Sequence, residues 1–130
     1  MRLYILSALH LECADFTPLI RDADLTILAG DIHTKRRGVA WAAANFSGQV
    51  VYVPGNHEYY DGNFPITRDK MQAEAAERVH VLDRQVLILG KIRILGAPGW
   101  TDFKSTGNEP LAYFTANCQM RDYLKIRKGS

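Results

Sequence analysis

Cysteine is scarce in this chain of 130 residues, and that scarcity excludes two classes of protein. The two cysteines, Cys13 and Cys118, stand far apart and form no pair with the spacing of metal ligands. A scaffold held by several disulfides and a zinc–thiolate site are therefore not expected. We expect reduced thiols in a cytoplasmic protein.

Long apolar runs and a large excess of one charge are also lacking. No run approaches the roughly 20 apolar residues that cross a bilayer, and Met1 to Leu3 lead into a strand-like segment without a signal-peptide layout. The net charge of +2 is too small to indicate binding to nucleic acid or to a membrane surface. With no repeat and no obvious linker, residues 1–130 are expected to form a single domain.

Five apolar runs rich in β-branched residues predict strands. The first three are continuous rather than alternating, which is typical of parallel strands covered on both faces. The last two are separated only by Gly90 and Lys91, which predicts a tight hairpin. The five runs are Leu3–Leu6, Leu25–Ala29, Val50–Val53, Val86–Leu89 and Ile92–Ala97.

Three helices are predicted between and after these strands. Val39–Phe46 is rich in alanine and lies between the second and third strands, which indicates a right-handed βαβ unit. Lys70–Arg78 has good helix formers, and Leu111–Ile126 has the pattern of an amphipathic helix. The sequence therefore predicts the α/β class, with a mixed sheet that is parallel first and antiparallel later, flanked by helices.

Polar residues follow each of the first three predicted strands at the point where the strand ends. They are His10 after the first, Asp31 and His33 after the second, and the segment Asn56–Glu58 after the third. Because the carboxyl ends of parallel strands share one edge of a sheet, these groups are expected to converge. Imidazole, carboxylate and amide donors without thiolate suit Mn, Fe, Zn, Co or Ni. Asp31, on the middle segment, is the best candidate to bridge two such ions.

These polar segments resemble the first three signatures of a known family, the calcineurin-like metallophosphoesterase superfamily. The matching segments are Leu9-His10-Leu11-Glu12, Leu28-Ala29-Gly30-Asp31-Ile32 and Val53-Pro54-Gly55-Asn56-His57-Glu58. The resemblance covers residues 1 to about 103. It implies an α/β/β/α sandwich, of which this chain supplies about half, and hydrolysis of a small phosphomonoester or phosphodiester at a dinuclear metal site.

The same resemblance implies a role for each matching residue. His10 would bind the first of two divalent metal ions, Asp31 would bridge both, and Asn56 would bind the second. His57 would hydrogen-bond the phosphate and protonate the leaving group, so His57 and Asp31 are the predicted catalytic residues. An imidazole suits this proton transfer because it titrates near neutral pH.

The chain departs from the family pattern in two ways that predict an inactive or impaired site. Ala8 stands where the first signature has an aspartate, so that one ligand position is lost. The histidine segments of the family's second half have no counterpart, so each ion would have two protein ligands and bind weakly or not at all. We expect a truncated domain whose uncovered apolar face is covered in a homo-oligomer or by a missing C-terminal half.

Several alternatives stay open from the sequence alone. His33 is either an auxiliary group of the site or part of a solvated loop. Arg36 either faces the phosphate or belongs to a solvated basic turn. Tyr59 either lines a substrate pocket or packs a loop onto the sheet. The whole chain could also be a non-catalytic interaction or scaffold module that uses the same fold with a degenerate site.

Overall fold

A parallel sheet of four strands forms the centre of the computed structural model, which describes residues 1–19 and 22–129. The strand order is β1-β2-β3-β5, where β1 is Leu3–Leu6, β2 is Leu25–Ala29, β3 is Val50–Val53 and β5 is Val79–Val81. The first three coincide with the first three predicted runs, which confirms the parallel part of the prediction. All three adjacent pairs are parallel, so the carboxyl ends of the strands lie along one edge.

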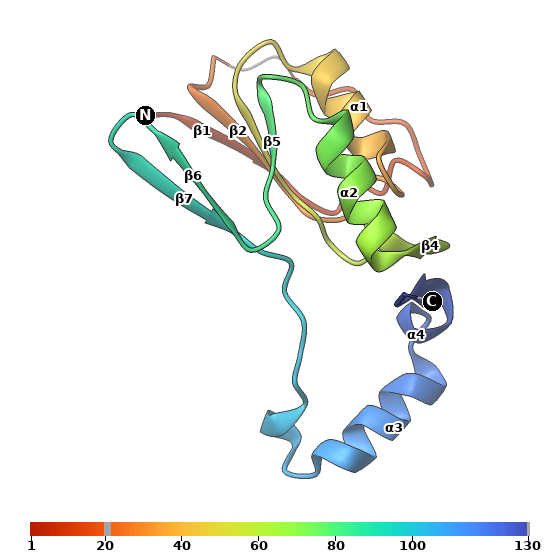
Figure 1. Ribbon diagram of the computed structural model, residues 1–130. Coiled ribbons are helices and arrows are strands. Elements are labelled where there is room, and N and C mark those ends of the chain that lie inside the picture. The colour runs from red at the N-terminus through yellow and green to blue at the C-terminus, as the bar shows by residue number, and fades with distance from the viewer. Residues whose placement is uncertain (20–21, 130) are drawn as a thin grey trace.

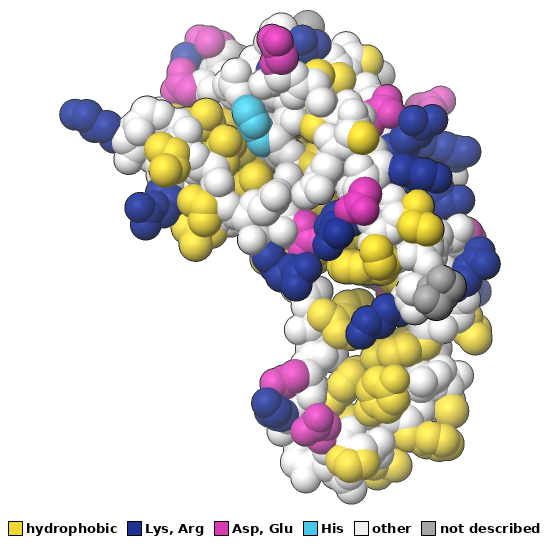
Figure 2. All heavy atoms as spheres, viewed as in Figure 1, with side chains coloured by type: hydrophobic (Ala, Val, Ile, Leu, Met, Phe, Trp, Pro, Cys, Tyr) yellow, Lys and Arg dark blue, Asp and Glu magenta, His cyan; other side chains and the backbone are white. Residues whose placement is uncertain are grey.

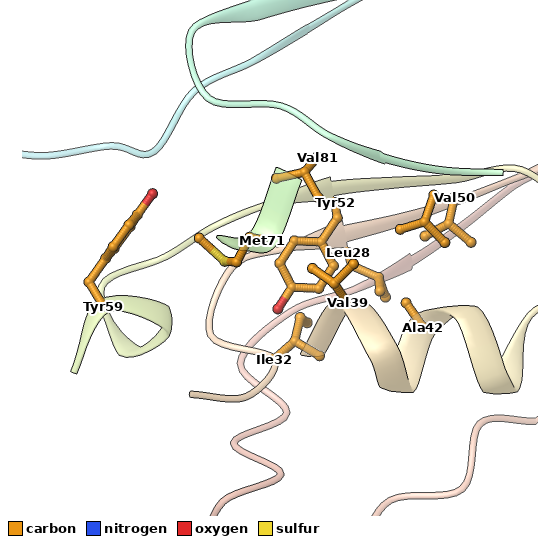
Figure 3. Packing of buried hydrophobic residues seen from close by; sticks show 10 residues of the cluster. Leu28, Ile32, Val39, Ala42, Val50, Tyr52, Tyr59, Met71 and Val81 are labelled. Atoms are coloured by element: carbon orange, nitrogen blue, oxygen red, sulfur yellow. The ribbon is translucent and has the colours of Figure 1, made fainter. Parts of the chain in front are cut away.

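Two helices cover one face of this sheet (Figure 1). They are α1, Arg37–Asn45, and α2, Phe64–Glu74. Val39 and Met71, one from each helix, pack with Leu28 and Tyr52 of the sheet, and all four are fully buried. Figure 3 shows the aromatic ring of Tyr52 among these side chains. The continuous apolar runs of β2 and β3 are thus explained by burial. In β1, however, Leu3 and Ile5 are exposed, so the prediction that this strand is covered on both faces is wrong.

The hairpin covers part of the opposite face and forms a sheet of its own. Strands β6, Gln85–Leu89, and β7, Ile92–Gly96, pair antiparallel around Gly90 and Lys91. Leu87 and Ile94 pack against a small buried cluster that includes Val51 of β3. The mixed α/β class and the hairpin are confirmed, but the parallel and antiparallel strands form separate sheets rather than the single sheet predicted.

The predicted helix boundaries are less accurate than the predicted strands. Helix α2 begins at Phe64, six residues before the predicted start, with Pro65 in its first turn, where a missing N–H costs nothing. It ends at Glu74 because Ala75 is extended and leads toward β5. The single predicted helix Leu111–Ile126 is wrong in its continuity, because Met120 has extended backbone angles and interrupts it.

After β7 the chain runs away from the parallel sheet and then comes back to pair with β4. We call residues 97–127 the C-terminal arm (Figure 1). The arm contains the short helix η2 (Lys104–Thr106), helix α3 (Glu109–Gln119), helix α4 (Asp122–Lys125) and strand β8 (Ile126–Arg127). Strand β8 pairs in parallel with β4, Gly62–Asn63, which follows the third predicted polar segment. The end of the arm is therefore fixed beside the edge where the polar groups converge.

The arm and the body enclose an open groove of about 1330 Å³. The hollow is visible between the upper and lower parts of Figure 2. Its walls include Asn56 and Asp122 and an aromatic series in which Tyr123 contacts Trp100 and Tyr113 edge to face. The groove reaches the edge of the parallel sheet.

The outer face of the hairpin is apolar and exposed. Val86, Ile88 and Leu95 each have more than half of their surface accessible to solvent. The predicted covering of such a face by another chain or by a further segment stays a prediction. Within the described residues, no helix is both long and apolar enough to span a membrane. The two cysteines are exposed and free.

Candidate metal centre

His10, Glu12 and His57 lie together at the edge of the parallel sheet, and we call them the histidine cluster. His10 follows β1, and His57 begins the short helix η1, His57–Tyr59, after β3. Oε1 of Glu12 lies 2.7 Å from Nδ1 of His57 and 3.2 Å from Nδ1 of His10. The two imidazole rings are 4.3 Å apart between centroids and nearly perpendicular. One donor atom from each residue lies within 4.8 Å of the other two.

The carboxylate of this cluster is in a form that can bind a cation. Burial alone would raise the pKa of Glu12, but hydrogen bonds from its own backbone N–H and from the rings of His57 and His10 lower it overall. Nδ1 of His33 lies 3.8 Å from the other Glu12 oxygen. Burial and the charge of Arg37 lower the pKa of His33, against the opposing charges of Glu12 and Glu58, which favours a neutral imidazole. Two imidazoles and a carboxylate match the ligand set of Zn, Mn, Fe and related ions, so the residues fit a divalent metal.

Asp31 lies next to the cluster because the ends of β2 and β3 meet there. Its Oδ1 accepts the backbone N–H of His57 at 3.0 Å. The backbone has φ +83° at Gly30 and +56° at Asp31, a left-handed turn that glycine adopts without cost. A Cβ on Gly55 would overlap Oδ1 of Asp31 and lie 2.8 Å from its backbone nitrogen. Glycine at position 55 is therefore required for Asp31 to come this close.

Glu58 fastens the two loops that carry Asp31 and His57, and its side chain is fully buried. It accepts the backbone N–H groups of Asp31 at 3.1 Å, Ile32 at 2.8 Å and Gly55 at 2.7 Å. It also accepts the hydroxyl of Tyr52 at 2.8 Å. Burial and the Glu58 charge raise the pKa of Tyr52 well above its ordinary value. A carboxylate with this many donors needs no cation partner, so Glu58 has a structural role.

Asn56 directly precedes His57 and contacts the C-terminal arm. Its amide Nδ2 donates to Oδ1 of Asp122, which is 8% exposed. The ring of Tyr60 stacks on His57 with 4.3 Å between centroids, and its hydroxyl lies 3.4 Å from the same Asp122 oxygen. Burial and the Asp122 carboxylate raise the pKa of Tyr60. We call Asn56, Tyr60 and Asp122 the amide cluster.

The structure places the remaining predicted residues as follows. His33 lies at the border of the histidine cluster rather than in a solvated loop. Arg36 pairs with Glu74 at 3.0 Å on the exposed surface, away from the cluster. Tyr59 is buried and stacks on Phe64. Their predicted auxiliary roles stay predictions.

Ala8 lies outside the histidine cluster, on the exposed turn after β1. It has φ +52°, and its backbone N–H donates to Gly30 at 3.0 Å. Glu12, four residues later, places a carboxylate beside both histidines. The loss of a ligand position at Ala8 stays a prediction.

Sequence reasoning missed two residues of the site, Glu12 and Asp122. Glu12 is two residues beyond His10, and this spacing within one loop was a usable signal. Asp122 is 66 residues from Asn56 and comes from a part of the chain with no predicted link to the edge of the sheet. Nothing local in the sequence indicates that contact.

A structural comparison finds a protein with a similar fold. The chain is similar to the crystal structure of phosphopantetheinyl hydrolase from Mycobacterium tuberculosis, with a TM-score of 0.59 and 16% identity over 96% of this chain and 54% of that one. The chain thus spans about half the length of that protein. At this identity the likeness shows a shared fold with a hydrolase and nothing finer. No family model matches the chain, and no curated protein matches it.

The predicted membership of the calcineurin-like metallophosphoesterase superfamily is therefore wrong. The finding that overturns it is the lack of any matching family model, together with a structural neighbour of only 16% identity. The motifs that carried the resemblance are short, and local folding accounts for much of them. Gly55 is needed for the approach of Asp31, and Glu58 is needed to fasten the loops. Such requirements belong to the turn geometry and do not identify a family.

Proposed function

We propose that this chain binds a divalent cation at the histidine cluster and supports hydrolysis of a phosphoester. The observation that carries the proposal is the convergence of His10, Glu12 and His57, with one donor atom from each within 4.8 Å of the others. The cluster lies at the carboxyl edge of parallel strands, where ligands bind in open α/β sheets. A shared fold with a hydrolase agrees with this class of reaction.

Phosphoester chemistry is favoured because a second set of oxygen donors lies beside the cluster. Asp31 accepts a hydrogen bond from the backbone N–H of His57, and Asn56 directly precedes His57 in the sequence. We propose that these two residues serve a second cation. Divalent cations in such a pair supply Lewis acidity and lower the pKa of water, which assists displacement at phosphorus. The groove that begins at Asn56 offers room for the leaving group.

His57 has two candidate roles in this proposal, and one experiment separates them. Its Nδ1 lies 2.7 Å from Glu12, and its ring packs against that of His10, which favours a ligand role. The role implied by the sequence was proton transfer to the leaving group. If His57 is a ligand, His57→Ala weakens Mn²⁺ binding; if it transfers a proton, the variant binds Mn²⁺ normally and loses turnover.

The test of the proposed function is a titration with Mn²⁺ combined with hydrolysis of an aryl phosphodiester. We expect Glu12→Gln to weaken Mn²⁺ binding about 10–100-fold, because a neutral amide neither attracts the cation nor orients both histidines. Glu74→Gln is the matched control, since Glu74 pairs with Arg36 on the surface. Equal Mn²⁺ affinity of Glu12→Gln and the wild-type chain would refute the site. Turnover that is lost in Asp31→Asn would exclude the alternative of a non-catalytic scaffold module.

A further inference from the structure

The amide cluster contains a buried carboxylate that the proposed reaction does not use. Asp122 is 8% exposed and belongs to α4 of the C-terminal arm. Its contacts are the amide of Asn56 and the hydroxyl of Tyr60. Burial of a carboxylate is costly unless its hydrogen bonds are made, so these contacts stabilise its position. The only charged member of the amide cluster therefore comes from a distant part of the chain.

The Asp122 carboxylate determines which way the Asn56 amide points. A carboxylate accepts hydrogen bonds and donates none, so only the NH₂ group of the amide can face it. The carbonyl oxygen of Asn56 must then point away from Asp122. Without Asp122, the two orientations of the amide would be much closer in energy, because an amide has a donor and an acceptor of nearly equal size.

Three further contacts hold Asp122 in place. Each joins the residues that follow Tyr60 to the end of the C-terminal arm. The backbone N–H of Asp61 donates to the carbonyl of Lys125 at 2.7 Å. The Lys125 ammonium lies 3.2 Å from the Asp61 carboxylate. Gly62 and Asn63 of β4 pair with β8. The arm is thus attached to the same loop that carries Asn56 and His57.

From this geometry we propose that Asp122 is a positioning residue, which fixes the Asn56 amide so that its oxygen is presented to the second cation. The inference deepens the proposed function and rests on it. It makes the C-terminal arm part of the metal centre, although the arm supplies no ligand. Partners of metal ligands typically change affinity by about 10–100-fold when they are removed.

The first experiment is made on the full chain without metal. In the wild-type protein, one of the two side-chain amide protons of Asn56 should resonate downfield and exchange slowly with water, because it donates to a buried carboxylate. The Asp122→Asn variant keeps the shape of the side chain and should lose both features. If these two NMR properties are the same in both proteins, the positioning role is wrong.

The second experiment measures Mn²⁺ affinity in matched variants. We expect Asp122→Asn to bind the second equivalent of Mn²⁺ about 10–100-fold more weakly than the wild-type chain. Asp61→Asn also removes a contact between the arm and the body, but it does not touch Asn56, so its Mn²⁺ affinity should equal the wild-type value. An equal loss in Asp61→Asn and Asp122→Asn would reduce Asp122 to a general anchor of the arm and overturn the inference.

These two experiments distinguish failure of the inference from failure of the proposed function. If the wild-type chain binds no Mn²⁺, the proposed function fails, and the NMR comparison still decides whether Asp122 orients the amide. If Mn²⁺ binds and Asp122→Asn retains the wild-type affinity, the metal centre stands and the positioning role fails.

Discussion

Replacing Glu58 by glutamine tests whether one buried carboxylate holds the site together. The two Glu58 oxygens accept five hydrogen bonds, of which Oε1 accepts three and Oε2 accepts those of Asp31 and Gly55. Glutamine has one acceptor oxygen and an NH₂ group that cannot accept. If its oxygen faces Ile32 and Tyr52, the backbone N–H groups of Asp31 and Gly55 face another donor. Two buried donors are then unpaired.

The magnitude follows from the cost of those unpaired donors. Each unsatisfied buried group costs about 1–3 kcal/mol, so Glu58→Gln should lower the free energy of unfolding by about 2–6 kcal/mol. A chain of this length loses roughly 3–5 °C of Tm for each kcal/mol, so the loss should be visible in any thermal scan. Tyr52→Phe removes one donor and leaves the other four, and should cost less, about 0.5–2 kcal/mol.

Urea unfolding followed by circular dichroism is the appropriate assay. Glu74→Gln is the control, because surface ion pairs contribute only about 0–1 kcal/mol. Mn²⁺ binding should fall together with stability in Glu58→Gln, since Asp31 and His57 lose their common support. A Glu58→Gln protein that unfolds within about 1 kcal/mol of the wild-type chain would refute the reasoning, because that cost is below a single unpaired buried donor.

Two further predictions concern the same loops. Gly55→Ala should destabilise the chain by about 1–3 kcal/mol through overpacking and should weaken Mn²⁺ binding by displacing Asp31. Gly99→Ala is the control and should do neither, because a Cβ at position 99 meets no atom within 4 Å. Equal unfolding midpoints for the two variants in urea would contradict this prediction. Alkaline unfolding should depend on Tyr52, whose pKa is raised above its ordinary value of 10.0 by burial and by Glu58. The unfolded chain loses this proton near pH 10 while the folded chain keeps it, so the stabilising contribution is complete below pH 10 and declines above it by up to about 1.4 kcal/mol per pH unit. Tyr52→Phe should flatten the decline in unfolding free energy between pH 10 and 11, and an unchanged slope would show that Tyr52 does not contribute.

The strands and the converging edge could be predicted because their signals are local. An apolar run such as Val50–Val53 is buried on both faces wherever it lies in a covered sheet, so its composition is enough to identify it. Parallel pairing then requires His10, Asp31 and Asn56 to meet at one edge. The order of the polar segments therefore carried real information about the site.

The rest of the site depends on contacts that no local pattern contains. The predicted helix Leu111–Ile126 has continuous amphipathic character, but the helix is interrupted at Met120. After this interruption α4 turns toward β4. That break places Asp122 beside Asn56. The pairing of β8 with β4 involves two residues from each strand, too few to leave a recognisable pattern. Tertiary contact, and not propensity, decides this part of the structure.

The loops of the candidate site also contain strained backbone, which the surrounding contacts must hold in place. Ala8, His10 and Asp31 have φ values of +52°, +49° and +56°, and each left-handed residue other than glycine costs about 1–2 kcal/mol. Backbone hydrogen bonds offset this cost: Ala8 donates to Gly30 at 3.0 Å, and His10 donates to Asp31 at 3.0 Å.

These bonds tie the loop after β1 to the loop after β2, and Glu58 ties the second loop to the third. Strain of this kind persists only where the surrounding contacts determine the conformation, and such places are often functional. The three loops therefore act as one unit, and a cation that binds the histidine cluster would stabilise all of them together by mass action.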